Sequence, residues 1–529
     1  MRRILFFYAI PLTLLLALFA AILVTVFTHA GDYGITIDEP LQNSYGRSVL
    51  AWYETGGHDQ SFLHYPENAY VPEHGPIFEV IVALTQQAFG GSWHTRAIVT
   101  GLAGFVGIVA IALCGFEIGG PWSAFLAAGG LWLYPRFFGA LFNNSKDIPF
   151  TSAVILAIWS VLLLVKRWDR SWQHLIGNAV LVGFLIGFAI AIRITALFWC
   201  PVMLCLVICW WICYGLRATK EHKVTYNLLK QCVVGFIIIA ASSLTIIALW
   251  PYIALNPLHD FYESYIVNSK YPVSAGILFR GYAYPNAFVP RNYAPVWLFI
   301  GSPPAIVVLA AIGCLVISLK LLWRKSIEGA IVLIALTFLI PLGIFVCMKP
   351  AFYDAMRQFL FLVPSMILIA VYGFVWAVRY CTQRRQKVIA IGLVIVLLIA
   401  QLQVFMEMRN LYPYEYIYIS PLIGGVSRIH SQYEMDYWGI CDKPSAEWLA
   451  QNYQKYTRKQ HPTIITSSVV DPRQATLYLP KNFEANYSNP DFYIGITRFG
   501  NDAEFSSYKV IHTEGVEGYI ACITKAKGK

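Results

Sequence analysis

Two adjacent carboxylates, Asp38 and Glu39, follow the first hydrophobic segment in the stretch GDYGITIDEPL (31–41). Pro40 prevents a helix from running through the pair, and adjacent residues do not share a helix face, so the two acids should point differently. A carboxylate in this position can accept the proton of an attacking hydroxyl group. We therefore predict Asp38 and Glu39 as catalytic residues. The plainer alternative is a pair of solvated loop residues, because acidic pairs are common.

Four further polar clusters are predicted on the same outer side, one within the first outer loop and three where hydrophobic segments end or begin. They are VPEHGPIFE (71–79), NNSKDIPF (143–150), Arg193 in AIRIT, and KPAFYDAMRQFLF (349–361). Charges at membrane depth usually pair or serve a site, although a single Lys or Arg can instead extend to the interface. Acids and cations together favour an anionic substrate and a proton acceptor. We predict these substrate-binding residues: Glu73, His74, Lys146, Asp147, Arg193, Lys349 and Arg357.

Sugar transfer from a lipid-linked sugar phosphate fits this set of residue types. Attack of a hydroxyl on an anomeric carbon needs one base, here Asp38, with Glu39 supporting the site or holding the acceptor. A phosphate leaving group needs cations rather than a general acid, whereas glycoside hydrolysis needs a second carboxyl. Arg can hold phosphate bidentately and Lys acts as a point charge. Among Lys146, Arg193, Lys349 and Arg357 we favour Arg357 and Lys146 as the phosphate clamp.

The composition is that of a polytopic helical membrane protein. Of the 529 residues, 57% are hydrophobic and 13% are charged, against about 25% charged in soluble proteins. The net charge of +10 is explained by basic loops and calls for no nucleic-acid partner. The cysteines lie mostly in hydrophobic runs without CxxC or Cys/His spacing, so no zinc site is expected. No DxD-like pair indicates a bound metal, yet the sequence leaves open a divalent cation between Asp38 or Glu39 and phosphate.

Eleven hydrophobic segments are predicted to span the membrane. They cover 4–27, 97–116, 121–141, 149–165, 175–193, 195–214, 231–252, 296–319, 329–348, 358–378 and 388–406. The first is expected to be an uncleaved span. The first outer loop, 29–95, should contain short amphipathic helices, and a second outer loop covers 253–295.

The distribution of basic residues predicts the orientation. With the N-terminus in the cytoplasm, the inner segments hold sixteen basic residues against four acidic ones, which are Glu117, Asp169, Glu221 and Glu328. The basic residues are Arg2, Arg3, Lys166, Arg167, Arg170, Arg217, Lys220, Lys223, Lys230, Lys320, Arg324, Lys325, Arg379, Arg384, Arg385 and Lys387. Every other conspicuous polar cluster then faces the non-cytoplasmic side of the cell membrane. We expect the active site and the C-terminal region there.

Residues 410–529 are predicted to form a small extracytoplasmic α/β domain after a transmembrane domain that covers 1–409. A helix-like stretch (444–453) and three strand-like runs (462–470, 491–497 and 518–524) support this prediction. Cys441 and Cys522 are the cysteines of this region, and an oxidising compartment would permit a disulfide between them.

The chain resembles the GT-C glycosyltransferases of the protein O-mannosyltransferase and aminoarabinose transferase group (families 39 and 83). The resemblance rests on the acidic pair in TIDEP, EHGPI where the family tends to have an HPPL-like sequence, SKDIP, MRQFLF (356–361) and YPYEYIYISPLIGG (412–425). It implies a polyprenyl- or dolichyl-phosphate sugar donor, inversion at the anomeric carbon, and catalysis by Asp38 outside the cytoplasm. Gly75 departs from the family's usual proline and leaves the role of His74 open.

Two other classes of function are compatible with these residues. A transporter or flippase of a lipid-linked saccharide could use the same cations, but transporters tend to place key polar groups near the bilayer midplane in symmetric halves. A non-catalytic membrane subunit would leave both acids passive. The sugar, the lipid chain length and the acceptor, whether lipid, glycan or protein, are not specified by the sequence.

Overall fold

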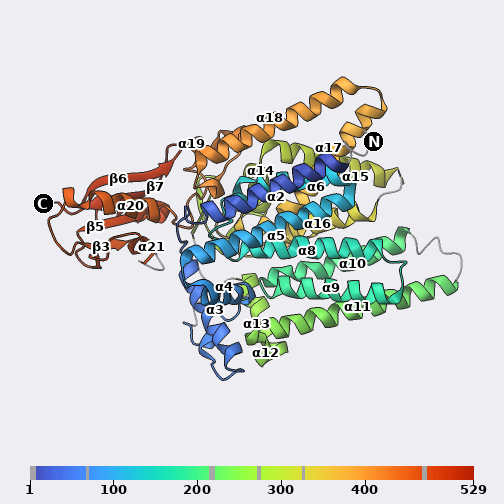
Figure 1. Cartoon of the computed structure of the whole chain (residues 1–529), viewed down its shortest axis with the longest axis horizontal. Coiled ribbons are helices and arrows are strands. Elements are labelled where there is room, and N and C mark those ends of the chain that lie inside the picture. Colours follow the sequence, from blue (N-terminus) through green and yellow to red (C-terminus); the bar gives the residue numbers. More distant parts are fainter. Residues whose placement is uncertain are drawn as a thin grey trace.

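The computed structural model describes residues 8–66, 71–213, 221–270, 276–323, 328–467 and 473–528. A bundle of helices carries a small sheet at one end (Figure 1). Ten helical segments of the described part are long and apolar enough to cross a membrane. They are α2 (Ile10–His29), α5 (Trp93–Gly119), α8 (Asp147–Lys166), α9 (Trp172–Ile190), η4 (Ile194–Phe198) with α10 (Trp199–Cys213), α11 (Glu221–Leu249), α15 (Pro304–Leu322), α16 (Gly329–Met348), η7 (Arg357–Leu362) with α17 (Val363–Gln383), and α18 (Lys387–Leu411).

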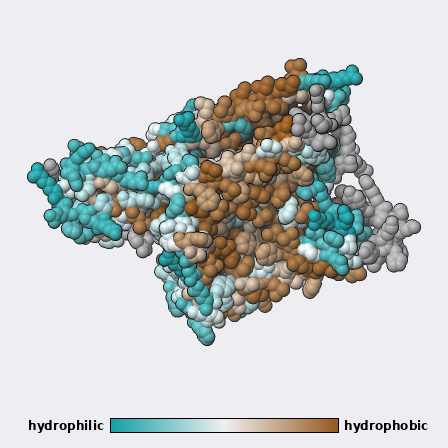
Figure 2. All heavy atoms as spheres, in the orientation of Figure 1, coloured by the Kyte–Doolittle hydropathy of each residue, from teal (hydrophilic) through white to brown (hydrophobic). Residues whose placement is uncertain are grey.

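The chain is therefore an integral membrane protein. Its bundle presents a broad apolar surface between two hydrophilic ends (Figure 2). The spans that begin at Asp147 and at Arg357 are 78% and 83% buried, whereas the α18 span is only 11% buried. Two predicted site residues thus begin helices at the centre of the bundle.

The segment 121–141, predicted as one span, is not a continuous helix. It forms α6 (Pro121–Trp132) and the short α7 (Pro135–Phe138), because Pro135 disfavours helical geometry in the preceding Tyr134. It nevertheless crosses the bundle. Arg96 in the first turn of α5 contacts Ser145, whereas Glu117 near its end pairs with Lys166 at the end of α8. Successive segments therefore still alternate between the two ends of the bundle, as the predicted distribution of basic loops requires.

The described basic residues assigned to the inner loops gather at the Glu117 end. Lys230 donates to the Trp168 carbonyl there, and Lys320 lines a small cavity with Gly119 and Arg379. Parts of the prediction lie outside the described residues, namely 4–7, 67–70, 214, 271–275 and 468–470 and the side chains of Arg2, Arg3, Arg217, Lys220, Glu221, Lys223, Arg324 and Lys325.

Short helices occupy the opposite end, as predicted for the first outer loop. They are α3 (Glu39–Glu54), η2 (Ser61–Leu63) and α4 (Ile77–Phe89). Asp38 is the residue before α3, and Pro40 lies in the first turn, so the helix starts at the acidic pair. The second outer segment forms α12 (Pro251–Leu255), α13 (Pro257–Lys270), a hairpin of β1 (Gly276–Phe279) and β2 (Tyr282–Pro285), η6 (Asn286–Phe288) and α14 (Tyr293–Ile300).

After α18 the chain first packs against the bundle and then forms a mixed five-stranded sheet in the order β4-β3-β5-β7-β6. The elements are η8 (Glu415–Ile417), η9 (Pro421–Ile423), α19 (Gly425–Ile429), α20 (Asp442–Asn452), η10 (Tyr453–Lys455), β3 (Thr463–Thr466), α21 (Arg473–Thr476), β4 (Glu484–Ala485), β5 (Phe492–Ile496), η11 (Arg498–Ala503), β6 (Lys509–Val516) and β7 (Tyr519–Ala526). The predicted helix and the three predicted strands correspond to α20, β3, β5 and β7. β4 and β6 were not predicted, because these edge strands are short or largely polar and lack an apolar run.

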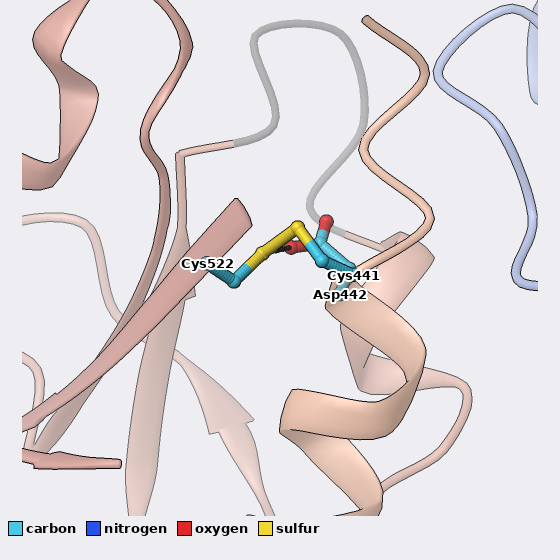
Figure 3. Close-up of side chains that lie close together, drawn as sticks. All are labelled: Cys441, Asp442 and Cys522. Carbon is cyan, nitrogen blue, oxygen red and sulfur yellow. Dashed lines mark hydrogen bonds between the residues drawn. A yellow bond between two sulfur atoms is a disulfide. The ribbon is translucent and has the colours of Figure 1, made fainter. Parts of the chain in front are cut away.

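Cys441 and Cys522 form the predicted disulfide, which ties the start of α20 to β7 (Figure 3). Both cysteines are fully buried, and the carboxyl group of Asp442 lies beside the Cys522 sulfur.

Candidate active site

Arg357 is the centre of a charged cluster at the polar end of the bundle. Its guanidinium donates to Asp38 at 2.7 Å, to Asp354 at 2.7 Å and to Asp147 at 3.3 Å. These three carboxylates come from the first outer loop, from the segment before η7 and from the first residue of α8. We call Asp38, Asp147, Arg193, Asp354 and Arg357 the Arg357 cluster. It contains four of the predicted site residues and adds Asp354, which belongs to the predicted KPAFYDAMRQFLF stretch.

Asp147 is fixed from three directions. Arg193 pairs with it at 2.7 Å, Arg357 contacts its other oxygen, and the side-chain amide of Asn144 donates to that same oxygen at 2.8 Å. The Asn144 side-chain oxygen also accepts from the backbone N–H of Asp147, which satisfies one of the donors left free at a helix start. Asn144 of the motif NNSKD therefore positions Asp147 of the same motif, and Asp147 in turn pairs with Arg193 after the end of α9.

Asp38 differs from the other carboxylates of the cluster in its exposure. Its side chain is 34% exposed, while those of Asp147 and Asp354 are 1% and 8% exposed. Asp38 thus offers an accessible oxygen while its other oxygen is held by a buried guanidinium. That arrangement suits a group that exchanges a proton with a substrate.

A second arginine, Arg498, reaches the cluster from η11 after strand β5. It pairs with Asp354 at 2.6 Å and with Glu434 at 2.9 Å. Asp354 and Ala355 both have left-handed backbone conformations, with φ of 58° each, and the Ala355 N–H donates to Glu434. Non-glycine residues rarely adopt this conformation unless the surroundings impose it. Sequence reasoning missed Arg498 and Glu434, because nothing in their local sequence distinguishes them from surface charges.

Glu39 belongs to a separate and fully buried group. Arg96 of α5 pairs with Glu39 at 3.1 Å and with Glu79 of α4 at 2.8 Å, and the Ser145 hydroxyl donates to Glu79 at 2.6 Å. We call Glu39, Glu79, Arg96 and Ser145 the Arg96 cluster. Burial raises the pKa of Glu39 to about 7, against the opposing effects of Arg96 and of the Thr36 backbone N–H. As predicted, the two adjacent acids point in different directions.

Lys146 lies close to both clusters and is itself buried. Its ammonium group donates to the Gly75 carbonyl at 2.7 Å, and burial lowers the pKa of Lys146 to about 8. The Gly75 backbone approaches α9 so closely that an added Cβ would lie 2.1 Å from the Ala191 carbonyl oxygen. The glycine in EHGPI, which departs from the family pattern, is thus required by this contact.

The structure does not bring every predicted residue to the Arg357 cluster. The Glu73 carbonyl accepts from Asn268 of α13, and burial raises the pKa of the Glu73 carboxyl, with a further increase from nearby Glu263. His74 is half-buried, and its carbonyl accepts from the Tyr45 hydroxyl. Lys349 is exposed at the left-handed residue that ends α16, and it forms no ion pair with any residue in the described part.

The first outer loop is held in place by the C-terminal part of the chain. The Ile37 N–H donates to the Trp438 carbonyl at 3.2 Å, and Lys443 donates to the Gly31 carbonyl. At Gly34 an added Cβ would lie 2.8 Å from the Ile440 carbonyl oxygen, so only glycine allows this approach. The position of Asp38 therefore depends on contacts with residues about 400 positions later.

No family model matches the sequence, and no curated protein matches it. Solved structures do. ArnT from Cupriavidus metallidurans bound to undecaprenyl phosphate matches with a TM-score of 0.50 and 12% identity, over 97% of each chain. AglB, the oligosaccharyltransferase of Archaeoglobus fulgidus, matches in complex with an inhibitory peptide and dolichol phosphate (TM-score 0.52, 12% identity, 92% of this chain and 69% of AglB) and in the apo form (0.53, 12%, 87% and 63%).

The chain has the GT-C fold. Both neighbours are glycosyltransferases of this fold, and the predicted resemblance is confirmed at that level. At 12% identity the likeness extends to the fold and not to the reaction. In this GT-C chain, the Arg357 cluster lies where the first outer loop, two central spans and the C-terminal region meet.

Two groups of described residues have the spacing of metal ligands. One is Cys441, Asp442 and Cys522, whose sulfurs are joined in the disulfide, and the other is His259, Asp260 and Glu263 on α13. Neither group includes Asp38 or Glu39. A divalent cation between these acids and a phosphate therefore stays a prediction.

Proposed function

We propose that the chain is a membrane glycosyltransferase that moves a sugar from a polyprenyl- or dolichyl-phosphate donor to an acceptor hydroxyl. The transfer takes place on the non-cytoplasmic face with inversion at the anomeric carbon. The observation that carries the proposal is the position of Asp38, a partly exposed carboxylate on buried Arg357 in a chain with the GT-C fold. The excess of basic residues in the opposite loops supports the orientation.

Asp38 is the general base of this reaction. The acceptor oxygen attacks the anomeric carbon while its proton passes to the Asp38 carboxylate. The bond from that carbon to the phosphate oxygen breaks, and its electron pair remains on the lipid phosphate. One carboxylate is sufficient because the leaving group is a stable anion.

The cations of the site stabilise the phosphate as it leaves. Arg357, Arg193 and Lys146 stand at one end of the bundle, and each is already bound to a carboxylate or carbonyl oxygen. A donor phosphate therefore competes with Asp38 for Arg357. Binding of the donor releases Asp38 from its ion pair and leaves it free to accept a proton, which couples donor binding to activation of the base.

The remaining predicted residues have supporting roles in this proposal. Glu39 holds the loop next to Asp38 through Arg96, and Asp147 orients Arg357 and Arg193. Glu73 and His74 lie on the adjoining segment of the first outer loop, where they contribute to acceptor or donor binding. Lys349, which is exposed, contributes to the long-range attraction of the anionic donor.

A direct test is to incubate the purified full-length protein with a panel of radiolabelled polyprenyl-phosphate sugars and candidate acceptors. We expect release of lipid phosphate with one of the sugars, and loss of this release in Asp38→Asn. A transporter of lipid-linked saccharides would move substrate across a vesicle membrane without releasing lipid phosphate. That result in the wild-type protein would overturn the proposed reaction.

A further inference from the structure

A groove of about 660 Å³ lies between α14, the β1–β2 hairpin and the segment from η9 to Tyr433. Three contacts assemble it. The Gly281 N–H donates to the Gln432 carbonyl at 2.8 Å, Phe279 pairs with Tyr433, and the Ser420 N–H donates to the Ile300 carbonyl at 2.7 Å at the end of α14. The groove is thus formed by segments far apart in the sequence.

The charge of the groove is positive. Arg280 and Arg428 line it, and none of the described residues that line it is acidic. Both arginines are exposed, and neither forms an ion pair with any residue that the structure describes. The Arg280 guanidinium lies over the Phe279 ring, 5.5 Å from the ring centroid. An anion is the complementary ligand.

The hairpin holds Arg280 in an unusual backbone conformation. The strand register pairs Phe279 with Tyr282, so Arg280 and Gly281 form a two-residue turn with φ of 54° and 79°. Asn and Gly favour this type of turn, because both central residues need a positive φ. An arginine at the first position places its guanidinium at the hairpin tip, against the groove.

The rest of the lining is apolar and open. Phe299 is 46% exposed and Leu422 is 63% exposed, and Val296 and Ile423 also line the groove. α14 leads within four residues into the membrane-spanning α15, so the groove opens at the end of a span. Cations at the rim and exposed hydrocarbon next to a membrane helix match a phosphate headgroup followed by lipid chains.

We propose that this groove binds the phosphate headgroup of an anionic membrane lipid, with the lipid chain along Phe299 and Leu422. The site is separate from the Arg357 cluster, none of whose members line the groove. Tyr433 lines the groove, and the next residue, Glu434, pairs with Arg498. A lipid in the groove would therefore lie next to the ion pairs that connect to Asp354. The proposal does not depend on sugar transfer and is tested without a donor.

The test is native mass spectrometry of the full-length protein in detergent with phosphatidylglycerol or phosphatidylcholine of identical chains. We expect the anionic lipid to bind at least about tenfold more tightly, with a loss of about tenfold for each arginine removed by Arg280→Gln and Arg428→Gln. Both side chains are exposed, so the double variant should keep the wild-type melting temperature. Arg47→Gln with Arg458→Gln, two exposed arginines elsewhere, should bind as the wild type does. Equal binding of both lipids, or an unchanged preference in the double variant, would overturn the proposal.

A second experiment distinguishes binding of a lipid from binding of free phosphate. Leu422→Gln removes apolar lining and leaves both arginines, so it should weaken phosphatidylglycerol binding severalfold. Inorganic phosphate should displace the lipid only at concentrations far above those of the lipid. If inorganic phosphate alone binds as tightly as the lipid and Leu422→Gln has no effect, the groove is a site for free phosphate and the lipid proposal fails.

Discussion

The Arg357 cluster and the Arg96 cluster are built from the same kinds of residues but differ in their exposure to solvent. In each, one buried arginine collects carboxylates from separate segments, and the adjacent residues Asp38 and Glu39 are divided between them. Every ionisable side chain of the Arg96 cluster is at most 5% exposed, whereas Asp38 in the Arg357 cluster is 34% exposed. Charge composition alone therefore does not separate a structural tie from a reactive site.

Solvent access separates them. A fully enclosed ion network mainly determines which segments pack together, because removing one member leaves an unpaired charge in a medium of low polarity. A network with one accessible carboxylate can exchange that carboxylate for a substrate anion. We expect substitutions in the first cluster to alter the reaction and substitutions in the second to alter the fold.

The largest effect is expected for Asp38→Asn. The change keeps the size of the side chain and removes the proton acceptor, so the rate of sugar transfer should fall by about 10² to 10⁴. The melting temperature in detergent should stay near that of the wild type, because the side chain is partly exposed. Asp32→Asn is the matched control, since this exposed acid of the same loop binds Tyr412 instead of Arg357. Transfer at the wild-type rate in Asp38→Asn would move attention to Glu39 or Glu73.

Arg96→Met should have the largest effect on stability. It leaves Glu39 and Glu79 buried without their cation, at a cost of about 3–5 kcal/mol in the free energy of unfolding. Thermal unfolding in detergent measures the loss, with Arg170→Met as an exposed control. Adding Glu39→Gln and Glu79→Gln to Arg96→Met should recover part of it. A melting temperature unchanged by Arg96→Met would remove the structural role of this cluster.

The pH dependence of donor binding should show whether Lys146 belongs to the phosphate site. Burial lowers the pKa of Lys146 to about 8, so its ammonium group loses its proton as the pH rises through that value. Affinity for the anionic donor should therefore decrease over the same range, and Lys146→Met should bind weakly and without this pH dependence. Binding of labelled donor at constant ionic strength measures both. A flat wild-type profile across about pH 7 to 9 would exclude Lys146 from the phosphate site.

The smallest effect is expected for Lys349→Gln. Lys349 is exposed and belongs to neither cluster, so donor affinity should change by no more than about threefold, the range of an exposed charge pair. Its contribution should disappear at high salt, where exposed charges are screened. A larger loss that persists in high salt would show direct contact with the phosphate.

The sequence by itself determined the membrane class, most of the spans, the C-terminal strands with apolar runs, and the grouping of polar motifs at one end. These features depend on hydropathy and charge summed over about twenty neighbouring residues, which tertiary contacts change little. The segment 121–141 is apolar enough for a span but is interrupted before Pro135. The predicted span 296–319 also begins too early, because its first residues belong to α14 and the spanning helix α15 starts at Pro304. The position of the acidic pair after the first span and the family resemblance both predicted Asp38 as the base, which stays a prediction, and the adjacency of the acids predicted that they point differently.

Only the tertiary structure determined which charged side chains pair with each other. Asp38 and Arg357 are 319 residues apart, and Arg498 reaches Asp354 from beyond a strand 144 residues later. Nothing in the sequence around Arg96 distinguishes it from a residue at the interface, yet packing of α3, α4 and α5 encloses it completely. Whether a charged side chain becomes a structural tie or a reactive group depends on the water that remains around it, and this is set by how distant segments pack.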